Sequence, residues 1–367
     1  MSRDTMTEIR NQLNLETDGS IIDSEIYKLS EEIKKRDLKR IYIVGCGDSY
    51  FAGLAVKNFM SSKLNIACLV MTALEFEAYS VDQVDDGCLV IAISMSGNVT
   101  RTISGVKKAQ ENGAFVIGLT NSTKGKLYNN STYPIFMDLK ENDGWTPGTI
   151  TYTGTIYNLI KLIISLLDEK SKLDYTNRIK VIFDYIKTNI ESIDELAQTV
   201  ARNLYLSQIE FPGYVLGGGP NYATAKYGAA KFLELCDVLT IGQETEEFAH
   251  QEFWIINKNA PVFMISHSGP SNERALEVAG ALRLFGNDII SISNDDRFEE
   301  VSKYFFRMPV DSTDDYLSPL LYQLPLQLIA YYYSQLKGFD PDNRTHMDPF
   351  RKKVSRLLTR GNKNAGY

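Results

Sequence analysis

Long apolar runs are missing from this sequence. The stretch IACLVMTAL, at residues 66–74, is about half of the roughly 20 residues that a membrane-spanning helix needs. The opening residues MSRDTMTEIR contain no apolar core of the kind that a secretory signal peptide has. Basic residues are also in deficit, since 39 Lys and Arg stand against 46 Asp and Glu and give a net charge of −7. We therefore expect a cytoplasmic protein that binds neither membranes nor nucleic acid.

Paired cysteines and nucleotide-binding glycine motifs are absent as well. The four cysteines form no CxxC pair and lie within apolar segments, at Cys46, Cys68, Cys88 and Cys236. We expect them to be buried thiols in a reducing compartment, with no metal site and no disulfide framework. No GxxxxGK[ST] or GxGxxG motif opens a predicted helix, so neither ATP nor NAD is implied and no cofactor is expected.

What the sequence does contain is an internal repeat. A shift of 172 residues places GCGDSY (45–50) on GGGPNY (217–222), Glu75 and Phe76 on Glu247 and Phe248, and ISMSG (93–97) on ISHSG (265–269). The offset holds from about residue 44 to 97 and then slips by one, so that VIGLTN (116–121) faces IISISN (289–294). Chance matches would not keep one offset across three separate motifs. The pattern predicts a duplicated domain.

Each half alternates short apolar runs with helical patterns. The first half has runs of strand length at RIYIVGCG, IACLVMTA, CLVIAIS, FVIGLTN and YPIFMDL, and helical spacing over 49–62 and 98–112. Continuous apolar strands separated by helices predict a parallel sheet that is covered on both faces. We expect an α/β fold of two tandem doubly wound parallel-sheet domains with helical extensions at both ends. The expected divisions are a first domain over 1–170, a second over 171–337 and a tail over 338–367, with residues 154–206 mostly helical.

The stretch ISMSGNVTR, at residues 93–101, lies between a predicted strand and a predicted helix. Ligands of open parallel sheets bind beyond the carboxyl ends of the strands, and a helix N-terminus favours an anion. The hydroxyls of Ser94, Ser96 and Thr100 would complete a neutral cradle for a phosphate group. Simple capping of the helix by the two serines is the alternative interpretation.

Three stretches carry a family resemblance: GCGDSYFAG, ISMSGNVT and LELCDVLTIGQETEEFAHQEF. Together they resemble the double sugar-isomerase (SIS) domain family of phosphosugar isomerases, deaminases and deglycases, and in particular the isomerase half of glucosamine-6-phosphate synthases. The likeness runs from about residue 6 to 344. It implies a sugar 6-phosphate as ligand. The positions that it implies for binding are Asp48, Ser49, Ser94, Ser96, Gly97, Thr100, Tyr152 and Glu247, with TYT (151–153) matching a substrate loop of the family.

Moving a carbonyl group between C1 and C2 of a sugar needs a base for the carbon-bound proton and an acid for ring opening. By the resemblance, Glu234 is the base, and His250, sixteen residues later, assists ring opening and protonates the departing group. From the residues alone, Glu234 also fits an i,i+3 partner of Lys231 on a solvated helix face, and His250 fits a surface loop.

Two further segments bear on the site: one repeats the serine loop, and the other departs from the family's C-terminal tail. His267 stands between Ser266 and Ser268 in a second copy of the serine loop, but the family uses the first-half site, so we interpret the second loop as structural. The synthases place a lysine in a C-terminal tail. Here Lys352 or Lys353 would serve that role only if about three residues are inserted, and a solvated amphipathic helix is the alternative.

Two chemistries fit these residues. One is a deglycase that converts a fructosamine 6-phosphate into an amine and an aldose 6-phosphate, and the other is isomerisation of an amino sugar 6-phosphate with loss of ammonia. The chain is too short for the synthase's glutaminase domain, so glutamine is not the expected nitrogen source. A non-catalytic phosphosugar sensor is the alternative function. The resemblance also implies a homodimer or higher homo-oligomer with shared active sites, because the family's catalytic histidine comes from a neighbouring chain.

Overall fold

The computed structural model describes residues 4–18, 20–139, 147–207, 212–309, 314–344 and 346–360. They form two compact units. Unit 1 comprises Met1–Glu16, Glu141–Thr149 and Leu173–Arg344, and unit 2 comprises Thr17–Lys140, Ile150–Lys172 and Thr345–Tyr367. The expected division after residue 170 lies close to Lys172, where the chain passes from unit 2 into unit 1. The expected assignment of both chain ends differs from the structure, because the N-terminal segment groups with the second half and the C-terminal segment with the first.

Unit 2 contains a five-stranded parallel sheet in the order β2-β1-β3-β4-β5. Its strands are β1 (Arg40–Gly45), β2 (Ala67–Thr72), β3 (Cys88–Ile93), β4 (Phe115–Thr120) and β5 (Tyr133–Phe136). Its helical segments are α3 (Ser20–Lys34), α4 (Asp48–Leu64), α5 (Ala73–Glu75), η2 (Phe76–Ser80), η3 (Val81–Gln83), α6 (Thr100–Glu111), α7 (Lys126–Asn130), most of α8 (Thr149–Ser165) and α15 (Pro349–Arg360). All five predicted strands and both predicted helices are therefore confirmed.

Unit 1 contains a second parallel sheet in the order β7-β6-β8-β9-β10. Its strands are β6 (Gly213–Gly217), β7 (Thr240–Gln243), β8 (Val262–Ser266), β9 (Ile289–Ser293) and β10 (Tyr304–Arg307). Its helical segments are α1 (Thr5–Asn11), η1 (Gln12–Asn14), α2 (Leu15–Asp18, which crosses into unit 2), most of α9 (Glu169–Leu206), α10 (Asn221–Cys236), α11 (Thr245–His250), η4 (Glu252–Trp254), α12 (Asn272–Phe285), α13 (Arg297–Val301), η5 (Ser318–Leu320) and α14 (Leu324–Leu336).

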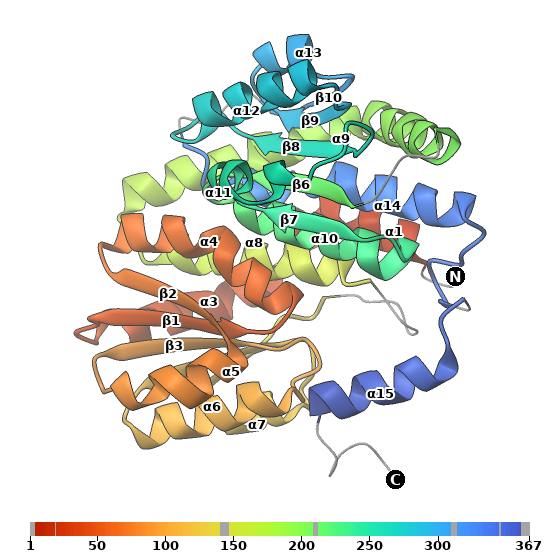
Figure 1. The fold of residues 1–367 in the computed structure, drawn as a ribbon. Helices are drawn as coiled ribbons and strands as arrows, with labels where there is room; N and C mark the ends of the chain where they lie inside the picture. Colours follow the sequence, from red (N-terminus) through yellow and green to blue (C-terminus); the bar gives the residue numbers. More distant parts are fainter. Residues whose placement is uncertain are drawn as a thin grey trace. The chain divides into compact units, whose positions relative to one another are not determined.

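Side chains of successive strand residues point to opposite faces of a sheet, and in these strands both sets are apolar. Helices therefore cover both faces of each sheet. In unit 2, α4 lies on one face, where Gly53 fits against Ile43, and α6 lies on the other, where Val106 packs with Val90 (Figure 1). The same alternation holds in unit 1, where the α10 side chain Phe232 stacks on Phe263, with ring centroids 5.2 Å apart. These buried layers fix the sheets and leave their carboxyl edges for loops.

The structure confirms the duplication. Both sheets follow the order 2-1-3-4-5 when their strands are numbered within each half. A buried aromatic pair recurs at the 172-residue offset: the rings of Tyr42 and Phe76 lie 5.5 Å apart, and those of Tyr214 and Phe248 lie 5.4 Å apart. The two halves thus share packing as well as strand order.

The N-terminal segment is tied to unit 1 by buried polar contacts. The backbone N–H of Thr5 donates to Asp342 Oδ1 at 2.7 Å, and Gln12 Nε2 donates to Gln327 Oε1 at 2.7 Å. The partners in each pair lie more than 300 residues apart in the chain. Such contacts explain why the first residues belong to the second-half unit.

Three of the four cysteines are buried free thiols, as expected, but Cys46 is exposed because it lies in the loop after β1. No helix in the described ranges is both long enough and apolar enough to cross a membrane.

Candidate active site

The strand order places a topological switch point between β1 and β3. After β1 the chain continues to β2 on one side, and after β3 it continues to β4 on the other. Ligands of doubly wound sheets bind in the crevice at this point, beyond the carboxyl ends of the strands. Val44 of β1 pairs with Ala92 of β3, so the loops that follow these strands emerge at the same edge. Asp48 and Ser49 therefore follow a strand that neighbours the one before Ser94 and Ser96, at the same edge of the sheet.

Gly97 shapes the serine loop. Its φ of +64° lies in the left-handed region that favours glycine. A Cβ atom here would come within 2.9 Å of the Gly125 Cα atom, so the two backbone segments lie too close together for a side chain at this position. The Gly97 N–H donates to the Ser94 carbonyl at 2.9 Å, and its own carbonyl accepts from Leu127 N–H at 2.9 Å. The loop is held by backbone contacts, which leaves its hydroxyls available.

The two serines of the loop differ in their partners. Ser94 is 2% exposed, and its Oγ has no hydrogen-bond partner among the residues that the structure describes. Ser96 Oγ accepts from the Asn98 N–H at 3.3 Å. Helix α6 has Val99 as its N-cap and no side-chain cap, so the alternative in which these serines cap the helix is wrong. A buried hydroxyl without a partner is costly, and a bound anion would satisfy it.

The first-strand loop adds a second helix N-terminus. Helix α4 begins at Asp48 after Gly47, whose φ is +55°, and Ser49 is buried in its first turn. A Cβ atom on Gly47 would meet nothing within 4 Å, so the space beside this loop is open. A carboxylate in the first turn of a helix is favoured by the helix dipole, which accounts for Asp48 without a ligand role.

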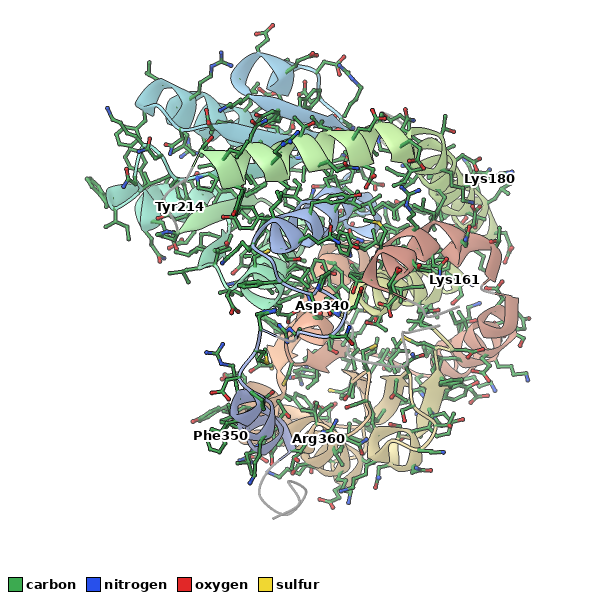
Figure 2. The ribbon with its side chains drawn as sticks, turned by 90° about the vertical axis from the view of Figure 1, so that its right-hand side faces the viewer. Lys161, Lys180, Tyr214, Asp340, Phe350 and Arg360 are labelled. Atoms are coloured by element: carbon green, nitrogen blue, oxygen red, sulfur yellow. The ribbon has the colours of Figure 1, made fainter. Side chains whose placement is uncertain are left out.

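Thr100 and the tail helix α15 meet within unit 2. Thr100 Oγ1 donates to the backbone carbonyl of Arg360 at 2.8 Å. Figure 2 shows Phe350 and Arg360 towards the two ends of α15. Lys353 is exposed on this helix, and the side chain of Lys352 lies outside the described part of the structure. The hydroxyl proton of Thr100 is therefore donated to this carbonyl in the present arrangement.

Tyr152 lies in a helix, so the expected substrate loop at residues 151–153 is wrong. These residues are buried in α8, which begins at Thr149. Helix α8 runs beside the serine loop, since Thr155 Oγ1 lies 3.8 Å from the Met95 sulfur atom. Tyr152 belongs to the wall behind the loop.

Glu234 lies near the C-terminal end of α10 in unit 1, with its side chain 38% exposed. Its Oε2 atom is 2.7 Å from the Nζ atom of Lys231, which is fully buried. The Lys231 ammonium also donates to the Pro147 carbonyl at 2.5 Å and lies 4.7 Å from the centre of the Tyr227 ring. An ammonium group fixed on several sides holds the carboxylate in one orientation. The predicted i,i+3 pair is present, with its lysine buried and its glutamate partly exposed to solvent.

Lys231 is a residue that the sequence reasoning missed as a member of the site. The sequence signal that could have indicated it is a lysine inside the apolar run GAAKFLEL, since a solvent-exposed helix face would contain more polar residues. Its burial depends on the Pro147 carbonyl, 84 residues away, which no local pattern reveals.

His250 is the last residue of α11, also in unit 1, and its side chain is 67% exposed. Its Nε2 lies 2.9 Å from Glu246 Oε1. Hydrogen bonds from Arg274 and His250 lower the pKa of Glu246 below its ordinary value. Glu247 is exposed on the same helix and accepts a hydrogen bond from Gln251. No hydrogen bond or ion pair joins His250 to Glu234 in the part of the chain that the structure describes.

The second serine loop is satisfied internally. Ser266 Oγ donates to Asn272 Oδ1 at 2.7 Å, and Ser268 Oγ donates to Asn294 Oδ1 at 3.0 Å. Burial lowers the pKa of His267 between them. A Cβ atom on Gly269 would lie 3.2 Å from the Asp315 carboxylate, so that side chain fills the adjacent space. These contacts favour the structural interpretation of this loop, in contrast to the unpartnered Ser94. Among the described residues, no group of three or more His, Cys, Asp or Glu side chains is placed to hold a metal ion.

Comparisons with known proteins match both halves of the chain. The SIS domain family model matches residues 35–160 and again 213–335, more than half of the chain. A glutamine–fructose-6-phosphate aminotransferase (isomerizing) of Thermococcus kodakarensis is 29% identical over 326 residues, which are 86% of this chain and 52% of that protein. The chain spans about half the length of the curated relatives it matches.

Two solved structures share the fold. The C-terminal domain of a glucosamine-fructose-6-phosphate aminotransferase from Francisella tularensis has a TM-score of 0.78 at 20% identity, over 92% of this chain and 98% of that one. A tagatose-6-phosphate ketose/aldose isomerase from Escherichia coli has a TM-score of 0.71 at 18% identity, over 95% and 96% of the two chains. At these identities the likeness shows the fold.

Proposed function

Because the chain belongs to the SIS domain family, we propose that it is a phosphosugar enzyme that catalyses aldose/ketose isomerase-type chemistry on an amino or fructosamine sugar 6-phosphate. The observation that carries this proposal is the carboxylate of Glu234, held by the fully buried Lys231 ammonium at 2.7 Å. A sensor needs a phosphate cradle but has no use for an oriented base. The reactions that we propose are a deglycation or a deaminating isomerisation, because both use the same base.

The serine loop holds the phosphate group in this proposal. Ser94 donates its unpartnered hydroxyl to a phosphate oxygen, and Ser96 contributes a second hydroxyl. The N-terminus of α6, which no side chain caps, adds backbone N–H groups and a favourable dipole. A neutral donor set of this kind binds a dianion without a lysine.

Glu234 moves the proton between C1 and C2. For a fructosamine 6-phosphate, the carboxylate removes a proton from C1, the electron pair forms the C1–C2 double bond of an enaminol, and the carbonyl oxygen at C2 is protonated. Return of the proton to C2 gives an imine at C1. Water then adds to the carbon of that imine. The C1–N bond breaks, which releases the amine and leaves an aldose 6-phosphate. For a 2-amino sugar 6-phosphate, the same steps begin at C2 and release ammonia and a ketose 6-phosphate.

Lys231 is a positioning residue in this scheme. It lies on the same helix as Glu234 and contacts its carboxylate, with the Pro147 carbonyl and the Tyr227 ring fixing the ammonium from other sides. Proton transfer requires that the base lie within hydrogen-bond reach of the carbon-bound hydrogen and that its carboxylate be correctly oriented. The ion pair restricts the carboxylate to such an orientation.

His250 serves ring opening, and it serves the active site of a second copy. Its side chain is 67% exposed, and no hydrogen bond or ion pair joins it to Glu234 among the described residues of its own chain. An apolar patch follows it directly: Phe253, Trp254 and Ile255, joined by Leu284 and Phe285 of α12. Trp254 is 79% and Leu284 is 90% exposed. With about 150–250 Å² for each aromatic side chain, the patch exposes on the order of 600 Å² of surface. This area is at the upper end of the apolar patches found on monomers. It is close to the roughly 800 Å² of surface that each partner buries in a stable pair.

One set of assays tests the reaction. The protein is incubated with fructosamine 6-phosphates, glucosamine 6-phosphate and other hexosamine 6-phosphates, and the release of hexose phosphate, amine and ammonia is measured. Turnover of at least one compound is expected. Glu234→Gln should abolish deuterium incorporation from solvent at C1 and C2 while ligand binding persists. Tight phosphosugar binding without turnover or exchange would instead establish a non-catalytic sensor.

Mixed dimers test the shared site. Glu234→Ala chains and His250→Ala chains, each inactive alone, are mixed and allowed to exchange. Shared sites give each mixed dimer one intact and one doubly altered site, so activity should return. Confirmed mixed dimers without activity would show that each site is built from a single chain. Trp254→Glu should dissociate the dimer in sedimentation experiments, whereas Leu173→Glu, another exposed apolar position, should not.

A further inference from the structure

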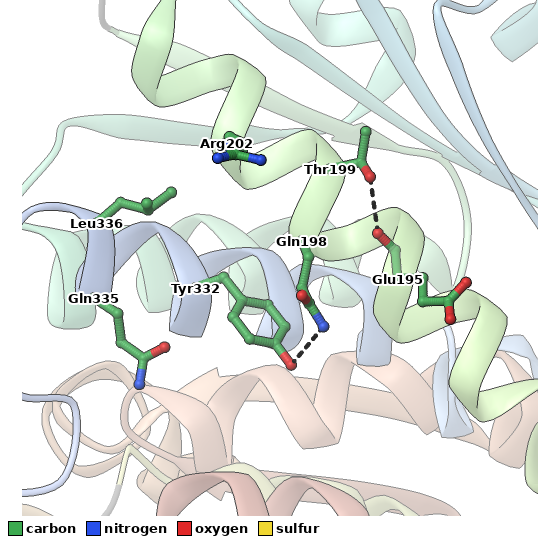
Figure 3. A pocket seen from close by; sticks show the side chains of 7 residues that line it. All are labelled: Glu195, Gln198, Thr199, Arg202, Tyr332, Gln335 and Leu336. Atoms are coloured by element: carbon green, nitrogen blue, oxygen red, sulfur yellow. Dashed lines mark hydrogen bonds between the residues drawn. The ribbon is translucent and has the colours of Figure 1, made fainter.

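A pocket in unit 1 is lined by none of the residues discussed so far. It is lined by α9 and α14, and its volume is about 550 Å³ (Figure 3). Sites for small molecules occupy roughly 300–1,000 Å³. Neither the sequence motifs nor the proposed reaction assigns a role to its lining.

The pocket carries opposite charges at its two ends. Glu195 and Arg202 both belong to α9 and are seven residues apart, close to two full helical turns, so they share one face of the helix about 10 Å apart along its axis. Figure 3 shows their side chains at opposite ends of the stretch that lines the pocket. Neither charged group has a hydrogen-bond or ion-pair partner within the described ranges. A ligand with two complementary charges would satisfy both ends.

The middle of the pocket is held in place by hydrogen bonds to the buried Asp194. Tyr332 of α14 donates its hydroxyl to Asp194 Oδ1 at 2.8 Å. Gln198 of α9 donates to Asp194 Oδ2 at 3.1 Å and to the Tyr332 hydroxyl at 3.3 Å, a contact drawn in Figure 3. Asp194 is buried, and Arg10 reaches its Oδ2 at 3.5 Å. This network keeps the Tyr332 ring fixed between the two charged ends.

The lining between the charges is partly apolar. Leu336 lies one helical turn after Tyr332 on α14 and is 39% exposed, so its side chain and the tyrosine ring form adjacent apolar surfaces. A chain of methylene groups would cover them. A ligand with adjacent charges, such as glycine, would reach only one end of the pocket.

From this geometry we propose that the pocket is a second small-molecule site, and that its ligand is an extended zwitterion of the ω-amino acid class. The carboxylate of the ligand pairs with Arg202, its terminal ammonium pairs with Glu195, and its methylene chain lies over Tyr332 and Leu336. Lysine and 6-aminohexanoate have this arrangement of charges. The inference concerns unit 1 alone and does not depend on the proposed reaction.

Calorimetric titration of the full chain tests this site with 6-aminohexanoate and L-lysine as probes. Hexanoate, hexylamine and glycine are the matched control compounds, since each lacks one charge or the spacing. Both probes should bind, and Arg202→Gln or Glu195→Gln should weaken each about tenfold or more, which is about 1.4 kcal/mol. Lys180→Gln and Asp184→Asn remove exposed charges from the same helix outside the pocket and should leave binding unchanged.

Three results would overturn the proposal: no heat of binding at millimolar concentrations of either probe, equal affinity in both pocket variants, or glycine binding as tightly as 6-aminohexanoate. Ser94→Ala, which should weaken phosphosugar binding, should leave the probes unaffected. Loss of the proposed reaction and loss of this site are therefore measured separately.

Discussion

Replacing Ser94 by alanine should stabilise the free protein and weaken its complex with a phosphosugar. In the free chain, Ser94 Oγ is buried and has no hydrogen-bond partner within the described ranges, and such a group costs about 1–3 kcal/mol. Taking the low end, because removal of the oxygen also loses packing, the free energy of unfolding should rise by about 1 kcal/mol, a Tm increase of roughly 2–4 °C. In the complex, the lost bond to a charged phosphate is worth about 1.5–3 kcal/mol, so Kd should rise about 10- to 150-fold.

Thermal melts without ligand and calorimetry with fructose 6-phosphate measure the two effects. Ser96→Ala is one control, because Ser96 Oγ already accepts from the Asn98 N–H. It should lose affinity and also lose stability. Thr102→Val is the other control, because Thr102 Oγ1 is a buried hydroxyl without a partner in α6, outside the loop. It should gain stability without losing affinity. A lower Tm for free Ser94→Ala, or an unchanged Kd, would refute the assignment of this hydroxyl to phosphate.

Three other changes have defined outcomes. Lys231→Met removes the ammonium that orients Glu234 and should lower kcat at least about tenfold with little change in KM; steady-state kinetics with an unchanged kcat would contradict the positioning role. Phe248→Ala opens a cavity beneath the second sheet and should cost about 3–5 kcal/mol in urea denaturation, and a cost below about 1 kcal/mol would show that the ring is not a core anchor. Hydrogen bonding from Arg297 lowers the pKa of Asp295 from 3.8 to about 2, so its stabilisation is complete above pH 4 and is lost as the pH falls towards 2. Urea midpoints of Asp295→Asn should therefore fall less over this range than those of the unaltered chain, and parallel curves would exclude the effect.

The sequence was most informative where local pattern and burial coincide. Strands such as Cys88–Ile93 are buried along their whole length, so continuous apolar composition revealed them. The repeat revealed the second sheet, since the Tyr214 and Phe248 pair copies Tyr42 and Phe76 in both sequence and packing. The family motif indicated Gly97, and the structure gives the physical reason for a glycine there, a φ of +64°.

The failures come from contacts that no local pattern encodes. Residues 151–153 resemble a polar loop, but the apolar residues at Ile156 and Ile160 continue a helix that begins at Thr149. Lys231 has the spacing of a surface ion pair, and only the distant Pro147 carbonyl shows that it is buried. The capping role of Ser94 was undecided because a strand-to-helix turn with serines fits both interpretations until the N-cap is seen.

The grouping of chain segments has a consequence for protein synthesis. Unit 1 includes the first sixteen residues yet is complete only when Arg344 has been added, and unit 2 is complete only with the segment from Thr345 onward. At about 5–20 residues per second, the 337 positions from Thr5 to Asp342 take roughly 20–70 s to translate. During almost all of that time Thr5 has no Asp342 to bind, and Thr100 has no Arg360 carbonyl. Unit 1 therefore lacks this contact until Asp342 has been synthesised, and unit 2 lacks the Thr100 contact until Arg360 has been, so both cores stay incomplete while most of these residues are translated.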